Sequence, residues 1–182
     1  MLSHVKALFF SSLILAIPVF ASANEGPWTL QASSSNSTFD GWHAYVYFRF
    51  GGDTEGEFWL TNDTKTVPTK FTLSSSSGNL VAYTTGKNAT EVFASIQPSL
   101  LSYDNDVWFF SQGELTVTDA TLLECPVSSN YVGCQVTNAN NTLLNTIYAC
   151  PIRWHGQPRA QLKIGLWVPT GCSGVQLNFT NV

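Results

Sequence analysis

The chain has 182 residues, of which only 11 % are charged, and its formal net charge is −4. This mildly acidic balance argues against nucleic acid and anionic membranes as partners. The length suffices for one domain with a hydrophobic core. Aromatic residues reach 13 % of the chain, so the fold has many large rings to bury or to expose.

The first 23 residues have the pattern of a secretory signal peptide. Lys6 precedes an apolar run, and the small residues at 21–23 (Ala-Ser-Ala) form a cleavage site. An uncleaved anchor is the alternative, but the run has about 14 residues, fewer than the roughly 20 that cross a bilayer. The sequence also ends at NFTNV without an apolar tail for a lipid anchor. We expect residues 1–23 to be removed and residues 24–182 to form a single all-β domain without a membrane anchor.

The rest of the sequence alternates apolar and polar residues with the period of two that β-strands show. In WHAYVYFRF, Trp42 and Val46 alternate with Tyr45 and Tyr47, and AQLKIGLW and GVQLNFT follow the same pattern. No stretch keeps a helical period. Further strand candidates are WTLQA, EFWLT, KFTLS, NLVAYT, EVFASI, DVWFF, ELTVT, TLLEC, YVGCQV and TIYAC. Many short strands between turns predict an antiparallel β-sandwich, jelly-roll-like or Greek key.

All four cysteines lie in the last third of the chain, at Cys125, Cys134, Cys150 and Cys172. An even number of cysteines in an exported chain predicts two disulfides. Zinc is the alternative, but the chain has no Cys-x2-Cys pair, and only two histidines follow the signal peptide. We therefore expect no metal and no cofactor.

The predicted pairing is Cys125 with Cys134 and Cys150 with Cys172, although four cysteines allow three pairings and the sequence does not exclude the other two. CPVSSNYVGC has the composition of a short hairpin that would bring its cysteines together. A proline follows Cys125 and Cys150, as expected where a strand ends. A closed loop of about 10 residues stabilises by somewhat under 3 kcal/mol and one of about 23 residues by more. Loss of the longer staple should therefore destabilise the fold more.

Five Asn-x-Ser/Thr sequons offer attachment points for N-linked glycans, at Asn36, Asn62, Asn88, Asn140 and Asn178. Chance sequons are common in a chain rich in Ser and Thr, so we expect about three of them to be occupied. Asn178 falls on the polar side of the GVQLNFT alternation, where a glycan has room.

Two glutamates are weak candidates for catalysis. Glu57 and Glu114 each follow a glycine at a predicted strand start, and secreted β-sandwich glycosidases use two carboxylates across a cleft. Solvated strand ends carry such residues as well, and sequence spacing does not place them together. His43 and His155 have no Gly-x-Ser-x-Gly elbow beside them, and His155 in RWHGQP is typical of a turn.

Sugar binding without catalysis is the better supported activity. The chain has six Trp and six Tyr, and such rings lie flat against the apolar faces of sugars. Trp154 has a loop-like setting, and Tyr45 and Tyr47 share the strand face opposite Trp42. The alternative is structural, because most Trp residues in a domain of this size fill the core.

Five segments of the chain follow one another in the order GDTEGEFWLTND, GNLVAYTTG, IYACPIRW, AQLKIGLWVPTGC and SGVQLNF. In this order they resemble segments of small secreted fungal cell-wall proteins of the phialide-protein (PhiA-like) type. The Cys-Pro pair expected after the first segment is missing, and Cys125 and Cys134 appear instead. The resemblance implies an extracellular, wall-associated protein with no known catalytic residues.

These observations together predict a secreted, N-glycosylated, non-enzymatic protein of a fungal wall or surface, with cell-wall polysaccharide as its expected partner. One alternative is a carbohydrate-binding module or small β-sandwich glycosidase that acts on wall polysaccharide. A further alternative is a secreted effector or allergen-like protein that acts on a host.

Overall fold

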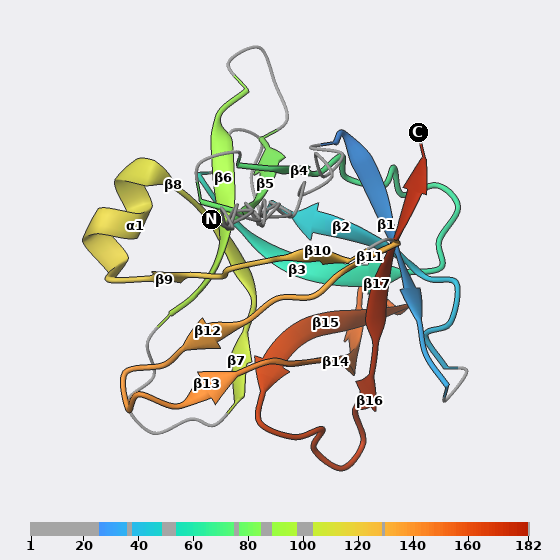
Figure 1. Ribbon diagram of the computed structural model, residues 1–182. Helices are drawn as coiled ribbons and strands as arrows, with labels where there is room; N and C mark the ends of the chain where they lie inside the picture. The colour runs from blue at the N-terminus through green and yellow to red at the C-terminus, as the bar shows by residue number, and fades with distance from the viewer. Residues whose placement is uncertain are drawn as a thin grey trace, which may run out of the picture.

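The computed structural model describes residues 26–35, 38–48, 54–74, 77–84, 89–97, 104–128 and 130–181. The expected signal peptide and the sequons at Asn36 and Asn88 lie outside these ranges. Within the described part, the chain forms antiparallel strands and one short helix (Figure 1).

The main sheet of the described residues has 15 strands and curls around the core into a half-barrel. Its longest path is β10 (Val127–Ser128), β11 (Tyr131–Val132), β17 (Gln176–Asn181), β1 (Trp28–Ser33), β2 (His43–Tyr47), β3 (Glu55–Thr61), β8 (Trp108–Ser111), β6 (Glu91–Ile96), β5 (Leu80–Tyr83), β4 (Thr72–Leu73). The strands off this path are β7 (Asp104–Asp106), β9 (Thr121–Leu122), β14 (Thr146–Trp154), β15 (Gln157–Gly165) and β16 (Ser173–Gly174). A separate pair joins β12 (Val136–Thr137) to β13 (Leu143–Leu144). The predicted all-β, antiparallel, sandwich-like fold is confirmed.

The sheet divides at β3, and this division positions the β14–β15 hairpin. One edge of β3 pairs with β2, while the other edge pairs first with β8 and then with β15. Val107 lies at the branch, where its carbonyl accepts from the Phe58 N–H at 3.1 Å and its own N–H donates to the Leu162 carbonyl at 3.1 Å. The hairpin therefore extends from the middle of the sheet (Figure 1).

The hydrophobic core lies on the inner face of the curled sheet. Phe109 packs there against Phe58 and Phe71, with ring centroids 5.2 and 5.9 Å apart. Each large apolar side chain buried in this way contributes roughly 1.5–3 kcal/mol. Other fully buried members are Leu30, Leu60, Leu80, Ile96, Leu123, Leu144, Leu162 and Ile164. The alternation of buried and partly buried residues along β1 and along residues 159–164 of β15 follows from this one-sided burial.

Both predicted disulfides are present, Cys125–Cys134 and Cys150–Cys172. The β10–β11 hairpin lies between the first two cysteines, as the sequence predicts, and both of these cysteines belong to the hydrophobic core. The second disulfide joins β14 to the turn before β16, which pairs with β14. The two staples thus differ in burial as well as in loop length.

The expectation that a strand ends at each Cys-Pro step is wrong for Cys150. β14 continues through Pro151 to Trp154 and stays paired with β15, with Pro151 opposite Ala160. Among the described residues, β16 covers the other edge of β14 only at Tyr148 and Ala149. A proline is tolerated beyond that point because a strand edge without a partner does not need its N–H.

The predicted strand ELTVT is wrong, because these residues form the helix α1 (Gln112–Thr118). Ser111 caps the helix by accepting a hydrogen bond from the Glu114 N–H at 3.4 Å. Thr116 and Thr118 donate from their hydroxyls to the carbonyls four residues earlier, at Gln112 and Glu114. The Ser-x-x-Glu start thus outweighs the strand preference of the β-branched residues.

Candidate functional site

An aromatic cluster covers the outer face of β2 and β3, opposite the core. Tyr45 lies across from Trp59 in the strand pairing, and their rings meet edge to face at 6.1 Å. Tyr47 stacks on Trp59 at 4.4 Å, and Trp154 from the tip of β14 touches both Tyr47 and Trp59. Trp59 is buried, while Trp154 is 39 % exposed. We call these four residues the aromatic cluster.

Glu57 belongs to the same face and is held by the cluster. Its side chain is 9 % exposed, and its Oε2 accepts hydrogen bonds from the Trp59 indole at 3.0 Å and the Gln161 amide at 3.4 Å. Glu114, by contrast, lies in α1 and accepts from the Thr54 hydroxyl at 3.2 Å. Among these contacts the two carboxylates have no hydrogen-bond partner in common. Each carboxylate binds side chains of its own surroundings.

An ion pair fixes the loop after β3 to β15. Arg159 donates to Asp63 at 3.2 Å and to the Thr61 hydroxyl, and its guanidinium lies 5.9 Å from the centre of the Tyr45 ring. Hydrogen bonds from the Lys65 N–H and from Arg159 lower the pKa of Asp63. Burial raises the pKa of Tyr45 to about 12, so its hydroxyl stays protonated at neutral pH.

The two histidines of the described chain have separate settings. The His43 ring lies 3.1 Å from the Thr66 carbonyl, and burial lowers its pKa. His155 is exposed in the turn between β14 and β15, where its φ is 47°, and its ring packs edge to face on Trp154. The turn predicted at His155 is therefore confirmed.

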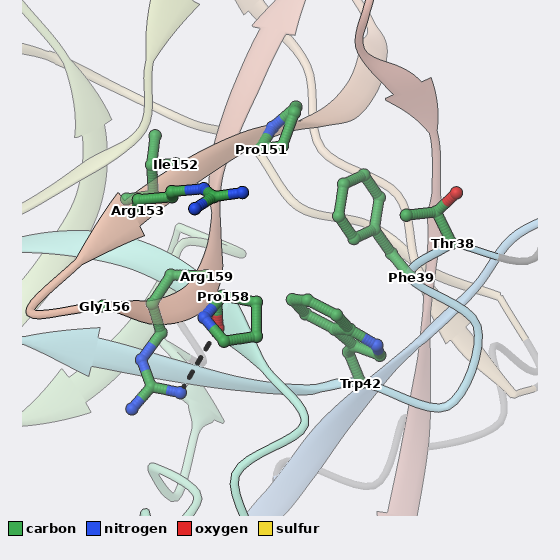
Figure 2. Close-up of a pocket in the computed structure, with 9 residues that line it drawn as sticks. All are labelled: Thr38, Phe39, Trp42, Pro151, Ile152, Arg153, Gly156, Pro158 and Arg159. Atoms are coloured by element: carbon green, nitrogen blue, oxygen red, sulfur yellow. Dashed lines mark hydrogen bonds between the residues drawn. The ribbon is translucent and has the colours of Figure 1, made fainter.

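A pocket of about 410 Å³ lies beside the β14–β15 hairpin, between it and the turn that joins β1 to β2 (Figure 2). Phe39 and Trp42 form one wall, with their rings edge to face at 5.1 Å. Figure 2 shows the side chains of Pro151, Arg153 and Arg159 around the same space. The residues lining this hairpin pocket are Thr38, Phe39, Trp42, Pro151, Ile152, Arg153, Gly156, Pro158 and Arg159.

The turn from β1 to β2 explains why the aromatic wall stands where it does. The Gly41 N–H donates to the Ala32 carbonyl at 2.9 Å, and the Trp42 N–H donates to the Phe39 carbonyl at 3.1 Å. Gly41 adopts a φ of 78°, which an L side chain rarely reaches. This tight turn buries Phe39 and leaves Trp42 half-buried at the pocket.

A second pocket, of about 500 Å³, lies over β4, β5 and β6 at the other end of the sheet path. Tyr83 and Glu91 line it and share a hydrogen bond of 3.2 Å. Ser74, Ser77 and Gln112 add further polar groups. Two aromatic residues, Tyr83 and Phe93, line this pocket as well, but it differs from the hairpin pocket in having the Glu91 carboxylate and no arginine among its described lining residues.

The structure places the expected aromatic residues and the described sequons in different settings. Trp154 is exposed at a hairpin end, and Tyr45 and Tyr47 lie opposite Trp42, as the strand pattern predicts. Among the sequons, Asn62 and Asn140 are exposed, whereas Asn178 is partly buried in β17 between β1 and β11. The sequence interpretation missed the hairpin pocket itself, although the FDGW turn was its visible signal.

Two further findings concern the described residues as a group. No three or more of their His, Cys, Asp and Glu side chains are arranged to hold a metal ion. No helix in the ranges given above is long and apolar enough to cross a membrane.

Comparison with known proteins gives no match to a family model, to a curated protein or to a solved structure. The resemblance to phialide proteins therefore stays a prediction.

Proposed function

We propose that this chain is a secreted, non-catalytic protein of a fungal wall or surface that binds polysaccharide at the hairpin pocket. The observation that carries the proposal is the half-buried Trp42, backed by the buried Phe39, which faces a hairpin that presents the Arg153 guanidinium (Figure 2). Aromatic faces pack on the C–H groups of a sugar ring, and polar groups around them fix its hydroxyls.

The pocket has the size and the hydrogen-bonding groups for one or two sugar rings. Its volume of about 410 Å³ falls in the range of small-molecule sites. Thr38 is exposed at the pocket and brings a hydroxyl, while Arg153 brings N–H donors. Prolines at 151 and 158 and the backbone pairing of β14 with β15 keep the lining rigid, so little entropy is lost on binding.

The contacts of Glu57 support binding rather than catalysis. A glycosidase needs one carboxylate free to protonate or attack the sugar, with a second about 5–9 Å away. Glu57 is instead buried under the aromatic cluster and accepts hydrogen bonds from Trp59 and Gln161. Glu114 has its own partner in Thr54.

The wall location is supported by several independent features. The two disulfides fit an oxidising, extracellular compartment. The N-terminal signal pattern, the sequons and the resemblance to phialide proteins agree with it. Fractionation of wall, medium and cytoplasm tests this part, and a protein confined to the cytoplasm would contradict it.

The binding test uses the full secreted chain on insoluble chitin, β-glucan and cellulose and on immobilised pectin. We expect wild type to be retained on at least one of them, and Trp42→Ala to lose at least tenfold in affinity. Trp167→Ala is the matched control, because Trp167 is 57 % exposed and is not among the pocket residues. Reducing sugars are measured in parallel, and their release would contradict the non-catalytic part.

A second variant covers the risk that Trp42→Ala unfolds. Thr38 is exposed at the pocket, so Thr38→Trp fills the space without removing a core contact. We expect it to melt like wild type and to lose retention. Folded wild type that binds none of the four polymers overturns the proposal, as does undiminished retention of Thr38→Trp.

A further inference from the structure

The hairpin pocket gathers positive charge in a chain that has little of it. The whole sequence has eight Lys and Arg residues against twelve Asp and Glu. Two of the eight, Arg153 and Arg159, line this one pocket, and no carboxylate is among its described lining residues. Because Arg159 is paired with Asp63, the positive character of the pocket on this acidic protein comes from Arg153.

The two arginines differ in how many of their N–H donors are already bound. Arg159 is bound to Asp63 and Thr61 on the side of the aromatic cluster, so most of its donors are used. Arg153 is exposed and lies opposite Pro158 in the hairpin, and the structure gives it no ion pair among the described residues. Figure 2 shows its guanidinium extending across the pocket, toward the space between Pro151 and Phe39.

We infer that the hairpin pocket binds a polysaccharide whose sugars carry carboxylates, with Arg153 pairing with the carboxylate while Trp42 packs on the ring. This inference rests on the proposed function and names its ligand class. A planar guanidinium donates two parallel hydrogen bonds to a carboxylate, which gives both strength and orientation. A neutral sugar offers no counter-charge to it.

The charge of the rest of the protein sets how this binding behaves. Because the chain is acidic overall, a polyanion is repelled except where local positive charge holds it. The favourable contact is short-ranged and solvent-accessible, so added salt weakens it. We expect binding of an acidic oligosaccharide to weaken as salt rises from 0.05 to 0.5 M, on the order of several fold.

The test compares a galacturonic acid tetramer with the same tetramer after its carboxyls are reduced to neutral galactose. Calorimetry on the full secreted chain should show that wild type binds the acid form at least tenfold more tightly. Arg153→Gln should lose this preference, and Arg153→Lys should keep part of it because it retains the charge but not the fork. Lys70→Gln is the charge-matched control, since Lys70 is exposed and is not a pocket residue.

The outcomes separate the two proposals. Equal binding of both tetramers, or an unchanged preference in Arg153→Gln, overturns the acidic-sugar inference and leaves polysaccharide binding in place. Retention on chitin, β-glucan or cellulose with no binding of the acid tetramer does the same. Failure of folded wild type to bind any polymer or tetramer removes both.

Discussion

The Trp59 indole donates a 3.0 Å hydrogen bond to the carboxylate of Glu57, which lies two residues earlier on the same face of β3. Both side chains are buried, so the bond compensates for the removal of a carboxylate from water. The Glu57 carboxylate therefore fixes the indole of Trp59 within the aromatic cluster.

Replacing Trp59 with Phe tests this role. The change keeps a ring against Tyr47 but removes the N–H donor and some volume, so we expect a loss of about 1–3 kcal/mol in the free energy of unfolding. Urea denaturation measures it. Trp154→Phe is the control, because Trp154 is partly exposed and should cost less. Equal losses for the two variants would show that the indole of Trp59 has no special role.

The disulfides should not rank by loop length alone. The cysteines are 9 and 22 residues apart, and chain entropy assigns about 2.7 and about 3.4 kcal/mol to the two staples. Cys125 and Cys134 are 1 % and 5 % exposed in the core, whereas Cys150 and Cys172 are half-buried. Removal of the buried sulfurs adds a cavity cost of on the order of 1–2 kcal/mol.

We therefore expect Cys125→Ala with Cys134→Ala to be less stable than Cys150→Ala with Cys172→Ala, the reverse of the order that loop length gives. Thermal denaturation of the two double variants measures this difference. A lower melting temperature for the variant without the Cys150–Cys172 bridge would mean that loop entropy outweighs burial.

Gly56 allows β3 to pass close under β2. A Cβ atom there would lie 2.5 Å from the Val46 Cγ1 and 2.9 Å from the Phe48 ring. We expect Gly56→Ala to destabilise the protein by about 1–3 kcal/mol through this overlap. Gly113→Ala is the matched control, since its Cβ meets only the Ser111 hydroxyl, at 3.9 Å, within α1. Alanine should stabilise that helix by about 0.5–1 kcal/mol. Chemical denaturation measures both, and a neutral Gly56→Ala would contradict the close packing.

His43 should make stability fall on mild acidification. Burial lowers its pKa below the usual 6.5, although the Thr66 carbonyl opposes this by favouring the protonated ring. The unfolded chain thus binds the proton more readily than the folded chain. The stability that the protein gains by keeping His43 neutral and buried is therefore present above pH 6.5 and is lost as pH falls below it. Urea midpoints at pH 7.5 and 5.5 should differ less for His43→Gln than for wild type. His155→Gln, at the exposed turn, should behave like wild type. An equal change in urea midpoint between the two pH values for all three proteins would contradict the prediction.

The sequence by itself determined the all-β character, the antiparallel pairing within the cysteine hairpin and the β14–β15 turn. Each of these depends on a local pattern, because strand alternation has a period of two and a turn needs only a few adjacent residues. The pairing of Cys125 with Cys134 is of this kind, since a short hairpin lies between them. The helix α1 was missed where two local signals conflicted: the β-branched residues of ELTVT favoured a strand, whereas Ser111 and Glu114 favoured a helix start.

Only the tertiary structure decided where the functional groups meet. The hairpin pocket joins Phe39 and Trp42 to Pro151 and Arg153, more than 100 residues later in the chain, because β3 pairs on one edge with β2 and on the other with β15. The role of Glu57 likewise depends on Gln161, which β15 brings across from Trp59. Strand order and register are set by the summed burial of the whole core, and no short stretch of sequence contains that sum.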